Sequence, residues 1–235
     1  MMWGYLMKFV LALAGALSLA TAAHAVTYDA FDSFDGTQGA GGFVYLKLPV
    51  VQGGMATQLS TSSSCVVTAD SCLQDGANLP GVYKSDTTFT EGTYTVPDDR
   101  LLAHPGAVNP LAILFVAPEA GAFDFTLSVN ILDSAPSGVF LQFLTNAGGS
   151  TAVTPIGALN AQNLAVTRTG TINLAQGEIF GFILGHGGSY SNDSVGVNFT
   201  LENGGVPEPA AWALMILGFG GAGAMLRRRA AGLAT

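Results

Sequence analysis

Short runs of β-branched and aromatic residues, separated by glycine and proline at close intervals, fill the middle of the chain. No long stretch there has the 3.6-residue apolar period of an amphipathic helix. Residues 122–129 alternate strictly instead, so that one face carries Phe123, Phe125, Leu127 and Val129. This is the pattern of a half-buried strand. It restricts the fold to sheets packed face to face or closed into a barrel.

Similar patterns predict further strands along the chain. Glu91-Gly92 stands between two of them and predicts a tight hairpin, and the continuously apolar run 111–116 predicts a strand buried on both faces. Eight to ten short antiparallel strands favour an all-β fold, a jelly-roll-like β-sandwich over residues 26–205. The glycine- and serine-rich part from Asp29 to Ala77 gives weaker signals. The other predicted strands are 43–48, 87–90, 93–96, 139–144, 171–174, 179–184 and 195–201.

Residues 1–25 have the layout of a secretory signal peptide, expected as an N-terminal signal helix. Lys8 supplies the positive charge, an apolar run extends from Phe9 to Ala20, and Ala23 and Ala25 form a small-x-small cleavage site. Cleavage there makes Val26 the first mature residue. A retained N-terminal anchor is the alternative, and Met7 would open a more usual signal peptide than Met1 does.

The C-terminal end has a different layout. Residues 210–226 carry no charge and precede Arg227, Arg228 and Arg229. Seventeen helical residues span roughly 26 Å, enough for a thin bilayer. The arginines keep their end in the cytoplasm by the positive-inside rule, so the sequence predicts a transmembrane helix with the domain outside. A buried core helix is the alternative.

Pro207, Glu208 and Pro209, followed by this apolar run and the arginine cluster, resemble the PEP-CTERM sorting signal over residues 206–230. The resemblance implies export through the general secretion machinery and processing by exosortase near the Pro-Glu-Pro motif. It further implies a transient stay in the inner membrane, then delivery to the cell surface, outer envelope or extracellular matrix of an exopolysaccharide-producing bacterium.

Charge and cysteines limit the partners. Between Val26 and Val206 there are four basic and 15 acidic residues, a net charge of −11, which disfavours nucleic acid as a partner. Cys65 and Cys72 are the only cysteines, and in an exported chain they predict a disulfide. A metal site is the alternative, but no histidine or further cysteine lies near them in the sequence.

A second resemblance covers residues 82–202. The segments 99–106, 117–121 and 190–194, in that order, resemble jelly-roll domains of exported bacterial proteins similar to carbohydrate-binding modules. The resemblance implies a fold and a class of ligand. It names no particular sugar.

Four residues are candidates for ligand binding: His104, His186, Tyr190 and Asp193. Each lies beside the end of a predicted strand, where the loops of a sandwich commonly bind ligands, and a tyrosine ring can stack on a sugar face. The first three could equally belong to ordinary loops packed on a sheet edge or to a glycine-rich hairpin tip. Sequence leaves open whether the two histidines and Asp193 converge.

No catalytic motif is present. No serine stands in Gly-x-Ser-x-Gly, and there is no His-Glu-x-x-His or phosphate-binding glycine loop. Asp98, Asp99, Asn192 and Asp193 could offer oxygen ligands to calcium, with a solvated acidic face as the alternative. We therefore expect a structural surface or matrix protein associated with exopolysaccharide or biofilm, without a cofactor. The alternatives are a carbohydrate-binding module and, less favoured, a glycan-active enzyme.

Overall fold

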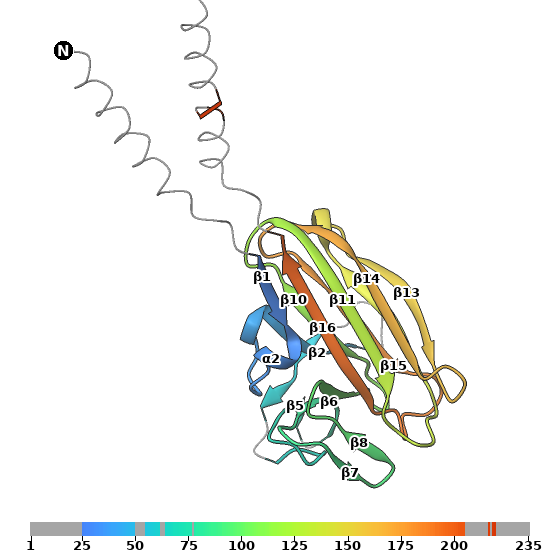
Figure 1. Ribbon diagram of the computed structural model, residues 1–235. Coiled ribbons are helices and arrows are strands. Elements are labelled where there is room, and N and C mark those ends of the chain that lie inside the picture. Colours follow the sequence, from blue (N-terminus) through green and yellow to red (C-terminus); the bar gives the residue numbers. More distant parts are fainter. Residues whose placement is uncertain are drawn as a thin grey trace, which may run out of the picture. The chain divides into compact units, whose positions relative to one another are not determined.

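The computed structural model of the chain describes residues 25–49, 55–61, 64–76 and 78–204, together with Ile216, Gly218 and Phe219. Within them, Val26–Gly204 forms one compact unit made of two facing β-sheets (Figure 1). The predicted signal peptide before Ala25 and nearly all of the predicted sorting tail lie outside the described residues, so their helices stay predictions. None of the helices in the described part is long and apolar enough to cross a membrane.

Eight consecutive strands, β9 to β16, form a jelly roll. Four of them lie in the first sheet in the order β9-β16-β11-β14, and four in the second sheet in the order β10-β15-β12-β13. All neighbouring pairs are antiparallel. This confirms the predicted jelly-roll-like β-sandwich. The strands are β9 (Leu101–His104), β10 (Leu111–Val116), β11 (Gly121–Ile131), β12 (Val139–Thr145), β13 (Ala152–Leu159), β14 (Ala165–Leu174), β15 (Ile179–His186) and β16 (Val195–Asn203).

The strands before β9 widen both sheets. In the first sheet, the order continues from β9 to β6, β5 and β4, and β1 pairs with β16. In the second sheet, the order continues from β10 to β2 and β3. The strands β7 and β8 form a separate hairpin. The described residues thus form sixteen strands, and the predicted eight to ten were too few. The elements are β1 (Val26–Asp29), α2 (Ala30–Ser33), η1 (Ala40–Gly42), β2 (Phe43–Lys47), β3 (Thr57–Gln58), β4 (Ser60–Thr61), β5 (Ser71–Asp75), β6 (Asn78–Lys84), β7 (Phe89–Glu91), β8 (Tyr94–Val96) and η2 (Ala147–Gly149).

The missed strands have physical reasons. β3 and β4 are two residues long, too short for any alternation to show. β13 contains Pro155 and Gly157, residues that argue against a central strand, and it can hold them because it is the edge of the second sheet. The predicted hairpin at Glu91-Gly92 is confirmed, with Gly92 at a positive φ of 60°.

The main core lies between the two sheets. Phe123, Leu127 and Val129 of β11 are fully buried there, with Phe125 packed against them, as the alternation predicts. From the facing sheet, Phe115 meets Phe123 with ring centroids 5.4 Å apart. Full burial of such a side chain contributes roughly 1.5–3 kcal/mol.

The two ends of the compact unit meet. Val26 pairs with Asn203, so the first and last strands end side by side on the first sheet. The start of β16 lies eight residues away, about 27 Å along the strand. The hairpin β7–β8 and the loop before β16 are therefore at the opposite end of the sandwich (Figure 1).

A disulfide joins Cys65 to Cys72, as predicted. It belongs to a small second apolar cluster on the outer side of the first sheet, where Cys72 packs with Tyr83 and Leu102. The bond holds the loop from 64 to 70 against that sheet.

Replacing both cysteines by serine should lower the free energy of unfolding by about 2–3 kcal/mol, because the short cross-linked loop regains chain entropy in the unfolded state. Urea unfolding of the double variant and of the oxidised wild type measures the difference. Equal stabilities would contradict a structural role for the bond.

Candidate functional site

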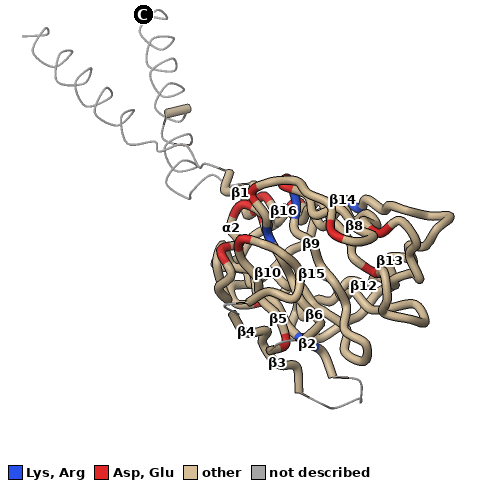
Figure 2. Tube along the Cα trace, turned by 90° about the horizontal axis from the view of Figure 1, so that it is seen from below, with Lys and Arg blue, Asp and Glu red and all other residues tan. Residues whose placement is uncertain are grey.

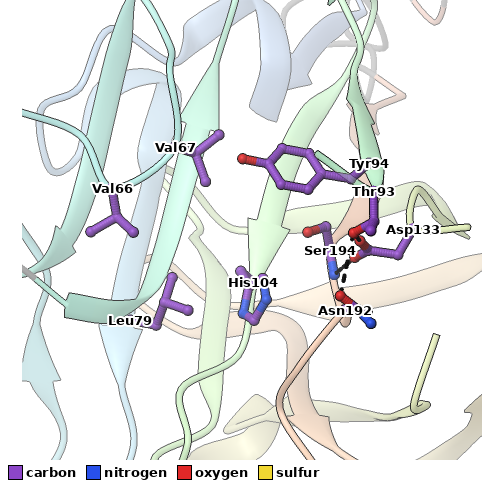
Figure 3. A pocket seen from close by; sticks show the side chains of 9 residues that line it. All are labelled: Val66, Val67, Leu79, Thr93, Tyr94, His104, Asp133, Asn192 and Ser194. Atoms are coloured by element: carbon purple, nitrogen blue, oxygen red, sulfur yellow. Dashed lines mark hydrogen bonds between the residues drawn. The ribbon is translucent and has the colours of Figure 1, made fainter. Parts of the chain in front are cut away.

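A pocket of about 180 Å³ lies at the end of the sandwich opposite Val26 and Asn203. Figure 3 shows its lining side chains from close by. It is formed by the disulfide loop, β6, the β7–β8 hairpin, the end of β9, the loop between β11 and β12 and the loop between β15 and β16. Its walls are Val66, Val67, Leu79, Thr93, Tyr94, His104, Asp133, Asn192 and Ser194.

Asp133 organises the polar wall. Its side chain is buried, and Thr93 Oγ1 donates to Oδ1 at 2.8 Å while the backbone N–H of Ser194 donates to Oδ2 at 2.7 Å. The backbone N–H of Ser134 also donates to the Thr93 carbonyl. One carboxylate therefore fastens the hairpin to the start of β16, and Figure 3 shows these side chains together on one side of the pocket.

His104, the last residue of β9, stands between the polar and apolar walls (Figure 3). Its Nδ1 lies 2.7 Å from the Pro105 carbonyl oxygen, which can only accept, so Nδ1 carries the proton. Burial lowers the pKa of His104, against the pull of Asp133 and Asp193. The ring is therefore neutral at pH 7, and Nε2 is a hydrogen-bond acceptor.

Asn192 supplies a donor. It is the one described residue other than glycine with a positive φ, at 58°, a conformation that asparagine tolerates better than most residues. Its side-chain amide, with Oδ1 3.3 Å from Thr93 Oγ1, brings both an N–H donor group and an oxygen acceptor to the polar wall. The polar wall thus offers a ligand both an acceptor and a donor.

The apolar wall rests on the disulfide loop and on Tyr94. Val66 donates its backbone N–H to the side chain of the fully buried Gln74 at 2.9 Å, and the Gln74 amide donates to the Ser64 carbonyl. Burial, and next the charge of Glu91, raise the pKa of Tyr94 to about 12, so its hydroxyl stays protonated. Valine and leucine side chains and one aromatic ring therefore face the polar groups.

Of the four predicted ligand residues, only His104 lines this pocket. Asp193 is fully buried between two lining residues, where its Oδ1 accepts from Ser137 Oγ at 2.8 Å and from the Gly138 N–H at 2.9 Å. His104 and His186 are the last of the groups that act on the pKa of its carboxyl, and the convergence of the three residues on one site stays a prediction. Tyr190 is 43% exposed and lies outside the lining. A role in ligand binding stays a prediction for all four.

Sequence reasoning missed most of the lining. Asp133 lies four residues after the predicted alternating strand 122–129, and an acidic residue in the loop after such a strand is a usable signal. The sequence predicts a hairpin that contains Thr93 and Tyr94, but it does not indicate which part of the fold this hairpin contacts. Val66 and Val67 lay inside the predicted disulfide loop, and nothing in the sequence brings that loop to β16.

No group of three or more histidine, cysteine, aspartate or glutamate side chains in the described part of the chain could hold a metal ion. The acidic residues near the N-terminus have local partners: Asp29 caps α2 by accepting from the N–H groups of Phe31 and Asp32.

Comparison with known proteins adds one decisive match. Residues 205–229 match the family model described as the PEP-CTERM protein-sorting motif. The chain carries this sorting motif. It starts one residue after the compact unit ends, and it indicates export and sorting to the cell surface.

No curated protein sequence matches the chain. Among solved structures, CBM51 from Clostridium perfringens GH95 in complex with methyl-galactose is 11% identical, with 60% of this chain and 99% of that chain covered and a TM-score of 0.36. PRD1 vertex protein P5 is 15% identical, with coverages of 68% and 95% and a TM-score of 0.30. Xyl-CBM35 in complex with a glucuronic acid-containing disaccharide is 16% identical, with coverages of 57% and 94% and a TM-score of 0.28. Likenesses this low carry no argument about function.

The buried carboxylate of Asp193 leads to a pH-dependent prediction. Its Oδ2 is buried with no hydrogen-bond partner, and burial raises its pKa above the ordinary value of 3.8. The protonated form is thus favoured by folding, a contribution present below pH 3.8 and lost as pH rises through the folded pKa. Asp193→Asn, which keeps an acceptor for Ser137 and Gly138, should gain stability relative to wild type between about pH 4 and pH 7.

Urea unfolding at several pH values measures that difference. Asp35→Asn is the contrasting control, because hydrogen bonds from the Thr37 side chain and backbone lower the pKa of Asp35. The stability of Asp35→Asn relative to wild type should fall as the pH rises towards 3.8, because the wild-type carboxylate becomes charged in the folded state before it does in the unfolded state. A difference for Asp193→Asn that does not change with pH would contradict the assignment.

Proposed function

We propose that this protein is exported, cut by exosortase near Pro207, Glu208 and Pro209, and displayed at the cell surface or in the extracellular matrix, where it associates with exopolysaccharide. The observation that carries the proposal is the sorting motif at residues 205–229, directly after a compact β-sandwich that ends at Gly204. The predicted signal peptide of residues 1–25 and the disulfide fit an exported protein. The role is structural, within a polysaccharide-rich layer or biofilm.

The pocket favours a second, compatible function, which is binding of a single sugar residue. A pyranose ring has apolar faces and a rim of hydroxyl groups, and here an apolar wall with a tyrosine ring faces an acceptor and a donor. A volume of about 180 Å³ is enough for one six-membered ring, since a cavity of roughly 150 Å³ admits benzene. Asp133 and the acidic domain disfavour anionic sugars, so the proposed ligand is neutral.

The position of the pocket supports display. The two ends of the compact unit lie together at Val26 and Asn203, while the pocket lies at the start of β16. A sandwich that continues into a sorting motif at one end would thus present its pocket at the other.

We propose binding without catalysis. A glycoside hydrolase commonly uses two carboxyl groups flanking the sugar bond, and among the described lining residues only Asp133 has one. Both of its oxygens already accept hydrogen bonds from the protein, and the proton of His104 is engaged by Pro105.

The sorting proposal predicts the mature C-terminus. In a host that has exosortase, the mature protein should lack Arg227 to Arg229 and end close to Pro207-Glu208-Pro209, as mass spectrometry of the released form would show. Replacing these three motif residues by alanine should leave the full-length chain in the inner membrane fraction. A wild-type chain that stays there with its arginines intact would point to a simple C-terminal anchor.

The pocket proposal predicts which aromatic side chain matters. Tyr94→Leu removes the ring from the pocket wall and should weaken binding of neutral glycans at least about tenfold, equivalent to about 1.4 kcal/mol. Binding by the compact unit is measured on a glycan array and then by calorimetry. The matched control is Tyr190→Leu, which removes an exposed ring outside the pocket and should leave the affinity unchanged. The reverse result would assign the contact to Tyr190.

A further inference from the structure

Two loops at the pocket end of the sandwich meet around one hydroxyl group. The loop between β11 and β12 contributes Ser137, and the loop between β15 and β16 contributes Ser189, Ser191 and Asp193. Ser137 Oγ lies 2.8 Å from the Ser189 carbonyl oxygen and 2.8 Å from the Ser191 carbonyl oxygen. It also lies 2.8 Å from Asp193 Oδ1. We call these four residues the oxygen cluster.

The oxygen cluster has too few protons for its contacts. Each of the three contacts has the length of a full O–H···O hydrogen bond, but a serine hydroxyl carries one proton, and carbonyl and carboxylate oxygens carry none. Among the described residues, no backbone N–H donates to the carbonyl of Ser189 or of Ser191. Protonation of Asp193 supplies only one more proton. Lone pairs therefore face each other without a hydrogen atom between them.

Asp193 gives a second, independent reason to expect a cation. The residue is fully buried, and its Oδ2 has no hydrogen-bond partner among the described residues. The ion pairs of the described residues, Lys47 with Asp75 and Arg100 with Asp99, do not include it. A buried charge without a partner is costly, so buried charges in proteins are paired or coordinate metal ions.

We propose that the oxygen cluster binds one calcium ion. Calcium takes six to eight oxygen ligands at about 2.3–2.6 Å, among them carboxylates, backbone carbonyls and water. Oxygens that share such an ion lie roughly 2.8–3.4 Å apart. The cluster offers the carbonyl oxygens of Ser189 and Ser191, the Asp193 carboxylate and Ser137 Oγ. Because the three serines are exposed, water completes the ligand shell.

Calcium suits the oxygen cluster better than other divalent cations do. Zinc is bound mainly by nitrogen and sulfur, and magnesium demands short, near-octahedral bonds. The cluster has one carboxylate, so it is consistent with the finding that no three acidic, histidine or cysteine side chains gather in the described part of the chain. The compact unit carries a net charge of −11, and Asp and Glu outnumber Lys and Arg along the tube in Figure 2. Its electrostatic field therefore attracts cations.

The position of the oxygen cluster gives the ion a structural role. Asp193 stands between Asn192 and Ser194, which both line the pocket. The same two loops meet a second time where the Gly187 N–H donates to the Gly138 carbonyl at 2.7 Å. A cation that joins these loops therefore holds the polar wall of the pocket. The proposal does not rest on the proposed function, because calcium binding is measured without a sugar.

Calorimetric titration of the mature protein, first stripped of metal with EDTA, tests the site. Wild type should bind one calcium ion with a dissociation constant of about 0.1–1 mM, the range of extracellular calcium modules, and calcium should raise its thermal unfolding midpoint. Asp193→Asn and Ser137→Ala should each weaken calcium binding at least about tenfold. The matched control is Asp35→Asn, which removes an equal charge from an exposed carboxylate already bonded to Thr37 and should bind calcium like wild type.

Terbium luminescence locates the ion in the unmodified protein. Tyr190 stands between two of the proposed ligands in the sequence, and an excited tyrosine sensitises terbium held close to its ring. Wild type should show terbium emission that calcium displaces, and Tyr190→Phe should lose most of this emission while it binds calcium as before. A wild type that binds no calcium at about 10 mM would overturn the proposal. So would calcium binding that both Asp193→Asn and Ser137→Ala leave unchanged, or equal stabilisation by sodium at the same ionic strength.

Discussion

The structure depends on the contact between the inner faces of its two sheets. Phe43 and Phe115 from one sheet meet Phe123 and Phe199 from the other, with ring centroids 5.4 to 5.8 Å apart. Edge-to-face and tilted ring contacts of this kind add to the free energy of burial. They also set how the strands lie over one another. The loops at the pocket end, which come from both sheets, therefore depend on this core for their positions.

The walls of the pocket are built on that core. A hairpin, a disulfide loop and the start of β16 are not neighbours in the sequence, and each is short. Asp133 joins the first to the third, and Gln74 with the disulfide secures the second. Polar groups with their partners satisfied are costly to move when buried, so the walls are held in place before any ligand arrives.

The two sheets present opposite surfaces outward. The first sheet carries charged side chains and the ends of the unit, and the second carries an apolar face with its single charged residue turned to the other sheet.

The sequence by itself determined the sorting motif, the disulfide and the class of fold. These follow from local patterns: an ordered tripartite tail, two cysteines in an exported chain, and the strict alternation seen at Phe123 to Val129. Strand 111–116 was even predicted to be buried on both faces, because its apolar run is unbroken. Only the tertiary structure decided that Asp133 meets Thr93 and Ser194, since hydrogen bonds between residues 40 to 61 positions apart leave no local pattern. It alone also showed an apolar outer face, because which face of a strand points outward depends on the sheet that packs against it.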